Sequence, residues 1–410
     1  MARGAEAGQR FPPNFIWGVA TAAHQIEGGN FNNDWWVWEH DPASGCAEPS
    51  GDACDSYHRW DQDVDLVARM GLGAYRFSLE WSRIEPAPGE FSTAALAHYR
   101  RVCEACRERE IEPVVTFHHY TLPRWLADRG GWEWADAPER FARFVTRAGA
   151  YLGEVIGRAC TINEPNVVGV LGYTLGEFPP GVRDDLRRHL AVNDTLVRAH
   201  RLAVEALRSG PGRFPVGITL SMAELVANEG GESVRDAAEE ILENGFLRAT
   251  AGDDFVGVQC YTRIHLGPEG KTADDPTVPQ TQMAYEYWPQ VVECTVRRAA
   301  NYSGIPVIVT ENGIATDDDT QRIRYMAEAL RGVSRCLDDG IDVRGYFAWS
   351  LLDNFEWTHG FKPRFGLYEV DRETFERRPK PSAQWLAGIA QANALVPHNG
   401  TGSQDGLVIE

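Results

Sequence analysis

No run of apolar residues in this chain is long enough to span a bilayer. The first ten residues, Met1 to Arg10, also lack the apolar segment of a secretory signal peptide. These two absences predict a cytoplasmic protein that has no membrane partner. Basic residues are in the minority, because 40 Lys and Arg stand against 59 Asp and Glu and the formal net charge is −19. A surface of this charge repels phosphate backbones, so we expect no nucleic-acid partner.

Cysteine is sparse, with 8 residues scattered over 410 positions. A chain of this size in a reducing compartment needs no disulfides. Cys103 and Cys106 form a C-x-x-C pair, but no second pair of this kind and no pair of histidines accompanies it. Because the stretch Tyr99–Glu110 has the pattern of an exposed helix, we favour ordinary helix packing over a zinc or redox site. We expect no metal and no cofactor.

The sequence also lacks a fixed-period repeat, a low-complexity tract and a linker rich in Pro, Gly or Ser. Its 410 residues are 43% hydrophobic, which is enough for a large buried core. We therefore expect one domain over residues 11–393. Residues 1–10 would form an N-terminal extension, and the polar residues 394–410 a C-terminal tail.

Short apolar segments alternate along the chain with longer amphipathic segments. We predict strands over Phe15–Ala20, Ala74–Trp81, Pro113–His119, Ala159–Asn163, Val216–Ser221, Asp254–Tyr261, Pro306–Thr310 and Gly345–Trp349. We predict helices over Trp60–Met70, Thr93–Glu110, Asp136–Leu152, Asp184–Arg208, Glu232–Arg248, Tyr285–Tyr302, Asp318–Asp338 and Ser382–Ala392. Several of these helices begin with Asp, Ser or Thr, which can accept hydrogen bonds from the free amides of a first turn.

Eight strand–helix alternations favour a single (β/α)8 barrel, the TIM barrel, over a doubly wound sheet. The first turn, Thr21–Gly29, contains no G-x-G-x-x-G motif of the kind that a dinucleotide-binding sheet carries. In a barrel the active site lies at the carboxyl ends of the strands. The polar residues at those ends are Gln25, Arg76, His118, His119, Asn163, Glu164, Tyr261, Glu311, Asn312 and the stretch Asp353–Trp357.

Two of these candidates, Glu164 and Glu311, are carboxylates at the mouth of the predicted barrel. A buried carboxylate is costly unless partners compensate, so a pair of them in one cavity indicates proton transfer or nucleophilic attack. Glycosidic cleavage uses such a pair, and a separation of about 5–5.5 Å marks retention of configuration. Arg76, Tyr261 and Asn163 are donors that could keep one carboxylate ionised while the other keeps its proton.

Tryptophan is abundant, with 13 residues. Trp17, Trp125, Trp349 and Trp357 lie at or near the ends of predicted strands. Indole rings stack on the apolar C–H faces of sugars, while polar side chains bind the hydroxyl groups. We interpret Trp60, Trp81 and Trp385 instead as core residues.

Several motifs that follow one another along the chain point to a known family. They are F-P-P-N-F-I-W-G at 11–18 with Q-I-E-G at 25–28, Y-R-F-S at 75–78 with W-S-R-I at 81–84, T-I-N-E-P at 161–165, T-E-N-G at 310–313 and W-S-L-L-D-N-F-E-W at 349–357. Together they resemble the signatures of glycoside hydrolase family 1, the β-glucosidase and β-galactosidase family. The resemblance runs from Phe11 to about Trp385.

The resemblance implies a retaining β-glycosidase, most simply a β-glucosidase, that acts on small β-glycosides or short oligosaccharides through a covalent glycosyl-enzyme. It implies that Glu164 is the acid/base and Glu311 the nucleophile, with Arg76 and Tyr261 in contact with the nucleophile. The residues that it implies for binding the non-reducing sugar are Gln25, His119, Asn163, Trp349, Glu356, Trp357 and Phe365.

The chain departs from the family pattern at two places near the expected site. The family often has H-W-D-L-P after the third strand, whereas His119–Pro123 reads H-Y-T-L-P. The sixth strand often ends in N-Y-Y, whereas Gln259–Tyr261 keeps the tyrosine behind a longer amide. The stretch Asn33–His40 looks more like archaeal and some actinobacterial members than plant members. The chain is also short for the family, which implies trimmed loops on the leaving-group side.

The sequence disfavours three related functions and leaves a fourth open. A 6-phospho-β-glycosidase would meet repulsion from Glu356, although Lys362 and Arg364 lie nearby in the sequence. A thioglucosidase tends to replace the acid/base residue, and a sugar-binding pseudoenzyme is expected to have lost a carboxylate, but Glu164 and Glu311 are both present. Transglycosylation shares the covalent intermediate and stays open. So do the natural leaving group, the oligomeric state and the preference among glucose, galactose and fucose.

Overall fold

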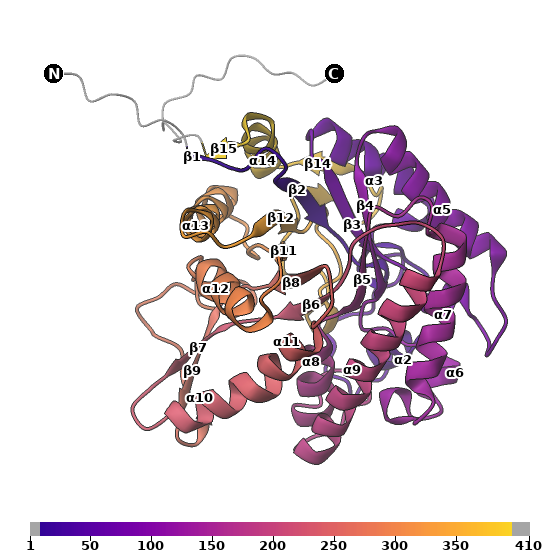
Figure 1. Cartoon of the computed structure of the whole chain (residues 1–410), viewed down its shortest axis with the longest axis horizontal. Coiled ribbons are helices and arrows are strands. Elements are labelled where there is room, and N and C mark those ends of the chain that lie inside the picture. The colour runs from indigo at the N-terminus through magenta and orange to yellow at the C-terminus, as the bar shows by residue number, and fades with distance from the viewer. Residues whose placement is uncertain (1–8, 396–410) are drawn as a thin grey trace.

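The computed structural model of the protein describes residues 9–395. Most of the N-terminal extension and C-terminal tail expected from the sequence therefore lies outside the described residues. The described parts of both pair with each other, because β1 (Gln9–Arg10) and β15 (Ala394–Leu395) form a short antiparallel ladder (Figure 1). No helix within residues 9–395 combines the length and the apolar character that crossing a membrane requires.

Eight parallel strands close into the predicted barrel (Figure 1). Around the barrel they are β2 (Ile16–Ala20), β3 (Ala74–Ser78), β4 (Glu112–His118), β5 (Arg158–Asn163), β6 (Val216–Ser221), β8 (Phe255–Gln259), β11 (Val307–Asn312) and β12 (Val343–Trp349). The last strand pairs with the first, which closes the ring. Each of the eight predicted strands corresponds to one of these, so the predicted (β/α)8 fold is confirmed.

Long helices surround the barrel. They are α3 (Ser56–Arg69), α5 (Thr93–Glu108), α7 (Ala137–Leu152), α9 (Leu186–Ser209), α12 (Val291–Ser303), α13 (Asp319–Asp338) and α14 (Pro381–Ala392). The helix α7 illustrates how they pack. Its apolar residues recur every three or four positions, so one face is buried; the buried residues include Phe141, Phe144, Val145, Ala148 and Leu152. That face packs against Phe117 and His118 of β4 and against α9.

Short elements follow the carboxyl ends of the strands and build the active-site side of the barrel. They are α1 (Ala23–Ile26), α2 (Asp34–Glu39), α4 (Trp81–Ile84), α6 (Arg124–Ala127), η1 (Gly131–Glu133), α8 (Pro165–Gly169), η2 (Val170–Thr174) and η4 (Trp357–His359). Small accessory sheets are formed by β7 (Glu224–Ala227), β9 (Arg263–Gly267) and β10 (Gly270–Lys271), and by β13 (Tyr368–Val370) and β14 (Arg377–Pro379).

Two predicted helices differ most from the structure. The helix predicted over Glu232–Arg248 consists of α10 (Glu232–Glu239), the π-helical turn η3 (Glu240–Asn244) and α11 (Gly245–Ala249). The helix predicted from Tyr285 begins only at Val291. Pro289 disfavours helical backbone in the residue before it. The side chain of Glu286 is also engaged elsewhere, since it pairs with Arg263 of the accessory sheet.

Cys103 and Cys106 pack as ordinary residues of a helix, as expected, but on the buried face of α5 and not on its exposed face. Both side chains are fully buried, because they lie on the face of α5 that packs into the core. All eight cysteines are free. Within residues 9–395, no three His, Cys, Asp or Glu side chains are grouped so that they could hold a metal ion.

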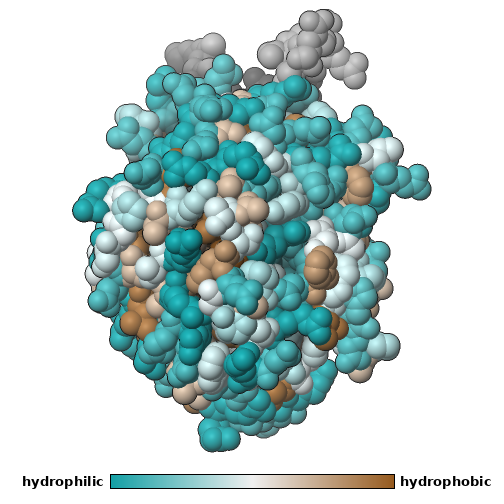
Figure 2. All heavy atoms as spheres, turned by 90° about the vertical axis from the view of Figure 1, so that its right-hand side faces the viewer, coloured by the Kyte–Doolittle hydropathy of each residue, from teal (hydrophilic) through white to brown (hydrophobic). Residues whose placement is uncertain are grey.

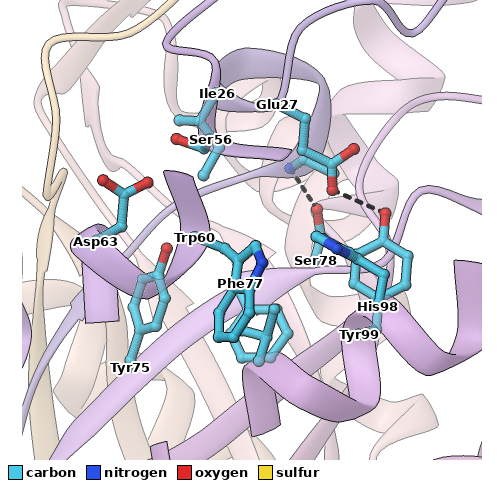
Figure 3. Close-up of a pocket in the computed structure, with 12 residues that line it drawn as sticks. Ile26, Glu27, Ser56, Trp60, Asp63, Tyr75, Phe77, Ser78, His98 and Tyr99 are labelled. Carbon is cyan, nitrogen blue, oxygen red and sulfur yellow. Dashed lines mark hydrogen bonds between the residues drawn. The ribbon is translucent and has the colours of Figure 1, made fainter. Parts of the chain in front are cut away.

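A cluster of buried polar side chains supports α1, the short helix that carries Gln25 (Figure 3). Tyr99 donates to Oε1 of Glu27 at 2.7 Å, and the amide of Ala23 donates to Oγ of Ser78 at 2.7 Å. The cavity that this cluster lines measures about 30 Å³. A space of this size holds about one or two water molecules and no sugar. The cluster therefore has a structural function, which is to fix both ends of α1.

Candidate active site

The buried side chain of Glu311 lies near the end of β11, the seventh barrel strand, and receives two strong hydrogen bonds. Arg76, from the end of β3, donates to its Oε1 at 2.5 Å. Tyr261, just beyond β8, donates to its Oε2 at 2.6 Å. The second terminal nitrogen of Arg76 donates to Oδ1 of Asn163 at 2.6 Å. The structure thus brings together four of the predicted site residues, which are Glu311, Arg76, Tyr261 and Asn163.

The second predicted carboxylate, Glu164, follows β5, the fourth barrel strand, and precedes α8. Its backbone is in the left-handed region with φ +43°, which is unusual for a residue with a side chain. Its side chain is buried and accepts a hydrogen bond from the hydroxyl of Tyr120. Strands four and seven are three places apart in the ring of eight, with β6 and β8 between them. Glu164 and Glu311 therefore come from different sides of the barrel, both at the carboxyl ends of their strands.

The surroundings of the two carboxyl groups are electrostatically unequal. Burial raises the pKa of Glu164 to about 8, and the negative charge of Glu311 adds to that rise. Burial also raises the pKa of Glu311, but the charge of Arg76 and the hydrogen bond from Tyr261 both oppose the rise. Because the guanidinium contacts Glu311 directly, Glu311 is the better site for the negative charge and Glu164 the better site for the proton.

A third buried carboxyl group, that of Glu356, lies beyond β12. It accepts a hydrogen bond from Nε1 of Trp349 at 3.3 Å. Burial raises its pKa well above the usual range for a carboxyl group. The amide nitrogen of Gln25 donates to the carbonyl of Phe355 at 2.7 Å, whereas its Oε1 has no hydrogen-bond partner among residues 9–395. Buried polar atoms without partners are rare, and a sugar hydroxyl would satisfy this one.

Aromatic rings flank His119. Its ring is nearly parallel to those of Trp349 and Trp357, with 6.1 Å between ring centres in both pairs. Asn163 contacts Nε2 of His119 at 3.2 Å. Burial lowers the pKa of His119 well below its usual range, so the ring is neutral and can donate from one nitrogen and accept at the other. Phe365 packs edge-on against Tyr261 at 5.8 Å, at the rim of the same cluster.

Two of the four tryptophans expected at the site do not join it. Trp17 is near the amino end of β2, where it donates to Asn393 at 2.9 Å, so it lies at the opposite end of the barrel from the site. Trp125 is buried against Trp81 and donates to the carbonyl of Glu85 at 2.9 Å. Position near a strand was too coarse a criterion, because Trp17 is at the amino end of its strand and Trp125, although it follows the carboxyl end of β4, packs into the core. The core interpretation is confirmed for Trp81, whereas Trp60 and Trp385 are partly buried and pack against the edge of the core.

Tyr120 was not among the site residues predicted from the sequence, although its hydroxyl contacts Glu164 directly. The available signal was its place next to His119, in the motif where the chain departs from the family pattern. The two basic residues noted in the sequence near Glu356 are both exposed. Arg364 is within ion-pair distance of Asp317 and Glu369 on the surface.

Comparisons with known proteins agree with this geometry. The family model described as glycosyl hydrolase family 1 matches residues 7–257 and 258–395. Beta-glucosidase A of Thermotoga maritima is 32% identical over 94% of this chain and 99% of its own length. The thermostable beta-glucosidase B of Thermobispora bispora is 34% identical over 94% of this chain and 91% of its own length.

Solved structures are similar over nearly the whole chain. The crystal structure of beta-glycosidase BGL167 has a TM-score of 0.89 and 46% identity, and the match covers 97% of this chain and 100% of that one. The beta-glycosidase from Pyrococcus horikoshii has a TM-score of 0.90 and 32% identity, with 97% and 99% of the two chains covered.

Proposed function

This chain belongs to glycosyl hydrolase family 1, and from that premise we propose that it is a β-glucosidase that retains the anomeric configuration. It is a glycoside hydrolase, and its relatives carry the name beta-glucosidase. The observation that carries the proposed division of roles is the unequal environment of two buried carboxyl groups. Arg76 and Tyr261 hold Glu311, whereas Glu164 keeps a raised pKa of about 8.

In the proposed first step, Glu311 attacks the anomeric carbon of a β-glycoside. The bond from that carbon to the leaving oxygen breaks, and its electron pair stays with the oxygen. Glu164 gives that oxygen its proton, so the leaving group departs as a neutral alcohol or phenol. The ion pair with Arg76 at 2.5 Å keeps the nucleophile ionised and oriented before the attack.

In the second step, water replaces the leaving group. Formation of the glycosyl ester removes the negative charge of Glu311, which is one cause of the raised pKa of Glu164. The pKa of Glu164 then falls, so the ionised carboxylate can take a proton from water as the water attacks the anomeric carbon. Two displacements, each with inversion, restore the original configuration.

The non-reducing sugar would be bound by the cluster around Glu356. Its carboxylate, the free Oε1 of Gln25 and the nitrogens of His119 can hydrogen-bond sugar hydroxyls. The indole of Trp349 offers the apolar surface, and Trp357 and Phe365 lie beside it. Asn163 touches both His119 and Arg76, so it connects this cluster to the nucleophile.

A neutral small-molecule β-glycoside or short oligosaccharide fits this site better than a 6-phosphorylated one. Glu356 offers a phosphate no positive charge, and the nearby basic residues Lys362 and Arg364 are exposed. A sugar-binding pseudoenzyme is disfavoured because both carboxylates are in place. Transfer to an acceptor other than water would use the same intermediate. A cytoplasmic location stays a prediction, which fractionation of the source cells would check.

The decisive experiment combines labelling with product analysis. A 2-deoxy-2-fluoro β-glucoside with a good leaving group should label Glu311 covalently, which mass spectrometry of the digested protein would locate. With an aryl β-glucoside, NMR in the first minutes should show the β-anomer of glucose first. An α-anomer formed first would mean inversion and would overturn the mechanism. A panel that includes β-galactoside, β-fucoside and 6-phospho-β-glucoside substrates would establish the specificity.

A further inference from the structure

Tyr120 makes a contact to the proposed acid/base that the family motif does not explain. It stands where the family pattern has tryptophan, directly after His119. Its hydroxyl donates a hydrogen bond to Oε2 of Glu164. Only 9% of the residue is exposed, so water competes little for that bond.

The turn that carries Tyr120 is fixed from both sides. Tyr120 has φ +67°, a conformation that costs a residue with a side chain some free energy unless its surroundings hold it. The next residue, Thr121, donates from its amide to the carbonyl of His119 at 2.8 Å and from its hydroxyl to Glu80 at 3.0 Å. The amide of Leu122 donates to Oδ1 of Asp34 at 2.8 Å.

Aromatic side chains hold the phenol ring as well. Trp357 packs against it at 5.0 Å with an angle of 73° between the ring planes. Phe178 packs against it at 5.4 Å and 76°. Both contacts are edge-to-face, a preferred arrangement of aromatic pairs. With the backbone and the ring both constrained, the hydroxyl of Tyr120 has one position, and that position is beside Glu164.

We propose that Tyr120 is a positioning residue that holds Oε2 of Glu164 and thereby leaves Oε1 to carry the catalytic proton. This inference rests on the proposed function of Glu164. A carboxylic acid has one proton, and the oxygen that accepts from the tyrosine is the poorer place for it. In the second step the ionised carboxylate keeps the same hydrogen bond, so Oε1 remains free to take the proton from water.

The charged and titratable groups that influence Glu164 come from several elements. They are Glu311 on β11, Arg76 on β3, Tyr261 after β8, Tyr120 after β4 and Tyr285 in the loop before α12. Among these groups, Tyr120 is the one that donates a hydrogen bond to Glu164. Burial and the charge of Glu311 raise the pKa of Glu164, whereas this bond, the charge of Arg76 and the side chain of Gln259 lower it.

The test is Tyr120→Phe, which removes one oxygen atom. A hydrogen bond to a charged group supports a shift of about one pKa unit, so the basic limb of the pH profile of kcat/KM should move up by about that amount. For an alkyl β-glucoside at neutral pH, kcat/KM should fall about tenfold because the proton is no longer directed. For a dinitrophenyl β-glucoside, which needs no proton, it should change little.

Tyr285→Phe is the matched control. Burial raises the pKa of Tyr285, and its hydroxyl is close enough for the charge of Glu164 to add to that rise, but among residues 9–395 it donates no hydrogen bond to Glu164. The basic limb of the pH profile of kcat/KM of this variant should lie at the same pH as that of the parent enzyme. All rates are normalised to active enzyme, titrated with the 2-deoxy-2-fluoro β-glucoside, so that a loss of folded protein does not affect the comparison.

Two outcomes overturn the proposal. One is an equal loss for both substrates with the basic limb unmoved, which would make Tyr120 a packing residue only. The other is the same upward shift in Tyr285→Phe. A failure of the proposed function has a different signature, because the parent enzyme would then show no covalent label on Glu311.

Discussion

At the scale of single residues, the site is built from unusual backbone conformations. Glu164, Tyr120 and Trp357 have φ values of +43°, +67° and +52°. The left-handed region costs a residue with a side chain about 1–2 kcal/mol. The three residues keep these conformations because they contact one another and the packed loops around them. Tyr120 bonds Glu164, and Trp357 packs on Tyr120. These conformations lower the stability of the folded protein, and they fix the positions of the three side chains.

Glu164→Ala tests the acid/base assignment. Because an activated phenol leaves without a proton, hydrolysis of dinitrophenyl β-glucoside should lose far less than hydrolysis of an alkyl β-glucoside, whose kcat/KM should fall by about 10²–10⁴. Azide should restore part of the turnover and yield a β-glucosyl azide, since it attacks the glycosyl-enzyme without help from a base. The measurement is kcat/KM for both substrates, together with kcat for dinitrophenyl β-glucoside with and without azide, because azide acts on the second step.

An equal loss on the two substrates, with no effect of azide, would argue against this role for Glu164. Glu108→Ala is a suitable control, because Glu108 is an exposed residue at the end of α5 and its removal should leave both rates unchanged.

Some residues of the site could be predicted from the sequence, and others could not. Glu164 and Glu311 lie in short contiguous motifs, so their positions could be predicted, and the structure brings Arg76 and Tyr261 into contact with Glu311 as expected. Tyr120 could not be found in the same way. Its partner is 44 positions away, and the contact depends on a turn whose backbone conformation no local pattern encodes.

At the scale of elements, the two strands that lead to Glu164 and Glu311 have irregular pairing directly before these residues. The pairing of β5 with β6 shifts between Cys160 and Asn163, directly before Glu164. The pairing of β11 with β8 shifts between Val309 and Glu311. Irregularities of this kind change the direction of side chains in a strand and are common next to active sites. Neither carboxylate side chain therefore follows the regular alternation of side chains between the inside and the outside of the barrel wall.

The strands were predicted better than the helices, and the reason is physical. A buried parallel strand is a short apolar run between turns, and this pattern is local. A helix boundary depends on competing contacts. The loop before α12 stays non-helical because Glu286 pairs with Arg263 and Pro289 interrupts the backbone, neither of which alters the apolar periodicity.

Arg322 on α13 connects two loops at the rim of the site, and its replacement should destabilise the fold. The buried guanidinium donates to the carbonyls of Ile314, Thr316, Arg364 and Phe365 and pairs with Asp319 at 2.8 Å. Breaking such a buried network costs about 3–5 kcal/mol. We expect Arg322→Met to lower the free energy of unfolding in urea by that amount. KM should rise as well, because the loop that carries Phe365 loses its anchor.

Arg324→Met is the matched control on the same helix. Arg324 is mostly exposed and lies 3.7 Å from Asp318, and surface pairs of this kind contribute about 0–1 kcal/mol. If Arg322→Met were no less stable than Arg324→Met, the network around Arg322 would not be holding the loops.

At the scale of the whole molecule, negative charge is distributed unevenly between surface and interior. The face in Figure 2 is largely hydrophilic, with small separated hydrophobic patches. The formal charge of −19 repels itself over such a surface. Inside, burial raises the pKa of several carboxyl groups, among them Asp34 and Glu243 to about 7 and Glu164 to about 8. These groups keep protons at a pH where the unfolded chain has lost them.

The last prediction concerns how stability depends on pH above neutrality. Carboxyl groups of the unfolded chain titrate near about pH 4, so the folded protein binds more protons than the unfolded chain from there to about pH 8. Stability from these raised pKa values is complete below that range and is lost as the pH rises through it. Buried histidines act in the opposite direction, since burial lowers the pKa of His98 to about 4 and of His118 to about 3. Their effect ends once the unfolded histidines are neutral, above about pH 6.5.

Between about pH 6.5 and 8 the buried carboxyl groups therefore dominate, and stability should fall with a slope of about 1.4 kcal/mol per pH unit for each proton involved. Urea unfolding at constant ionic strength would measure it. Glu164→Gln keeps the shape of the side chain but has no proton to lose, so its slope should be shallower by about one proton. Glu108→Gln removes the same charge from the exposed surface of α5 and should keep the slope of the parent protein. A stability that is constant or rising over this range, or a slope that Glu164→Gln leaves unchanged, would show that Glu164 holds no proton at neutral pH. The first catalytic step would then need another acid.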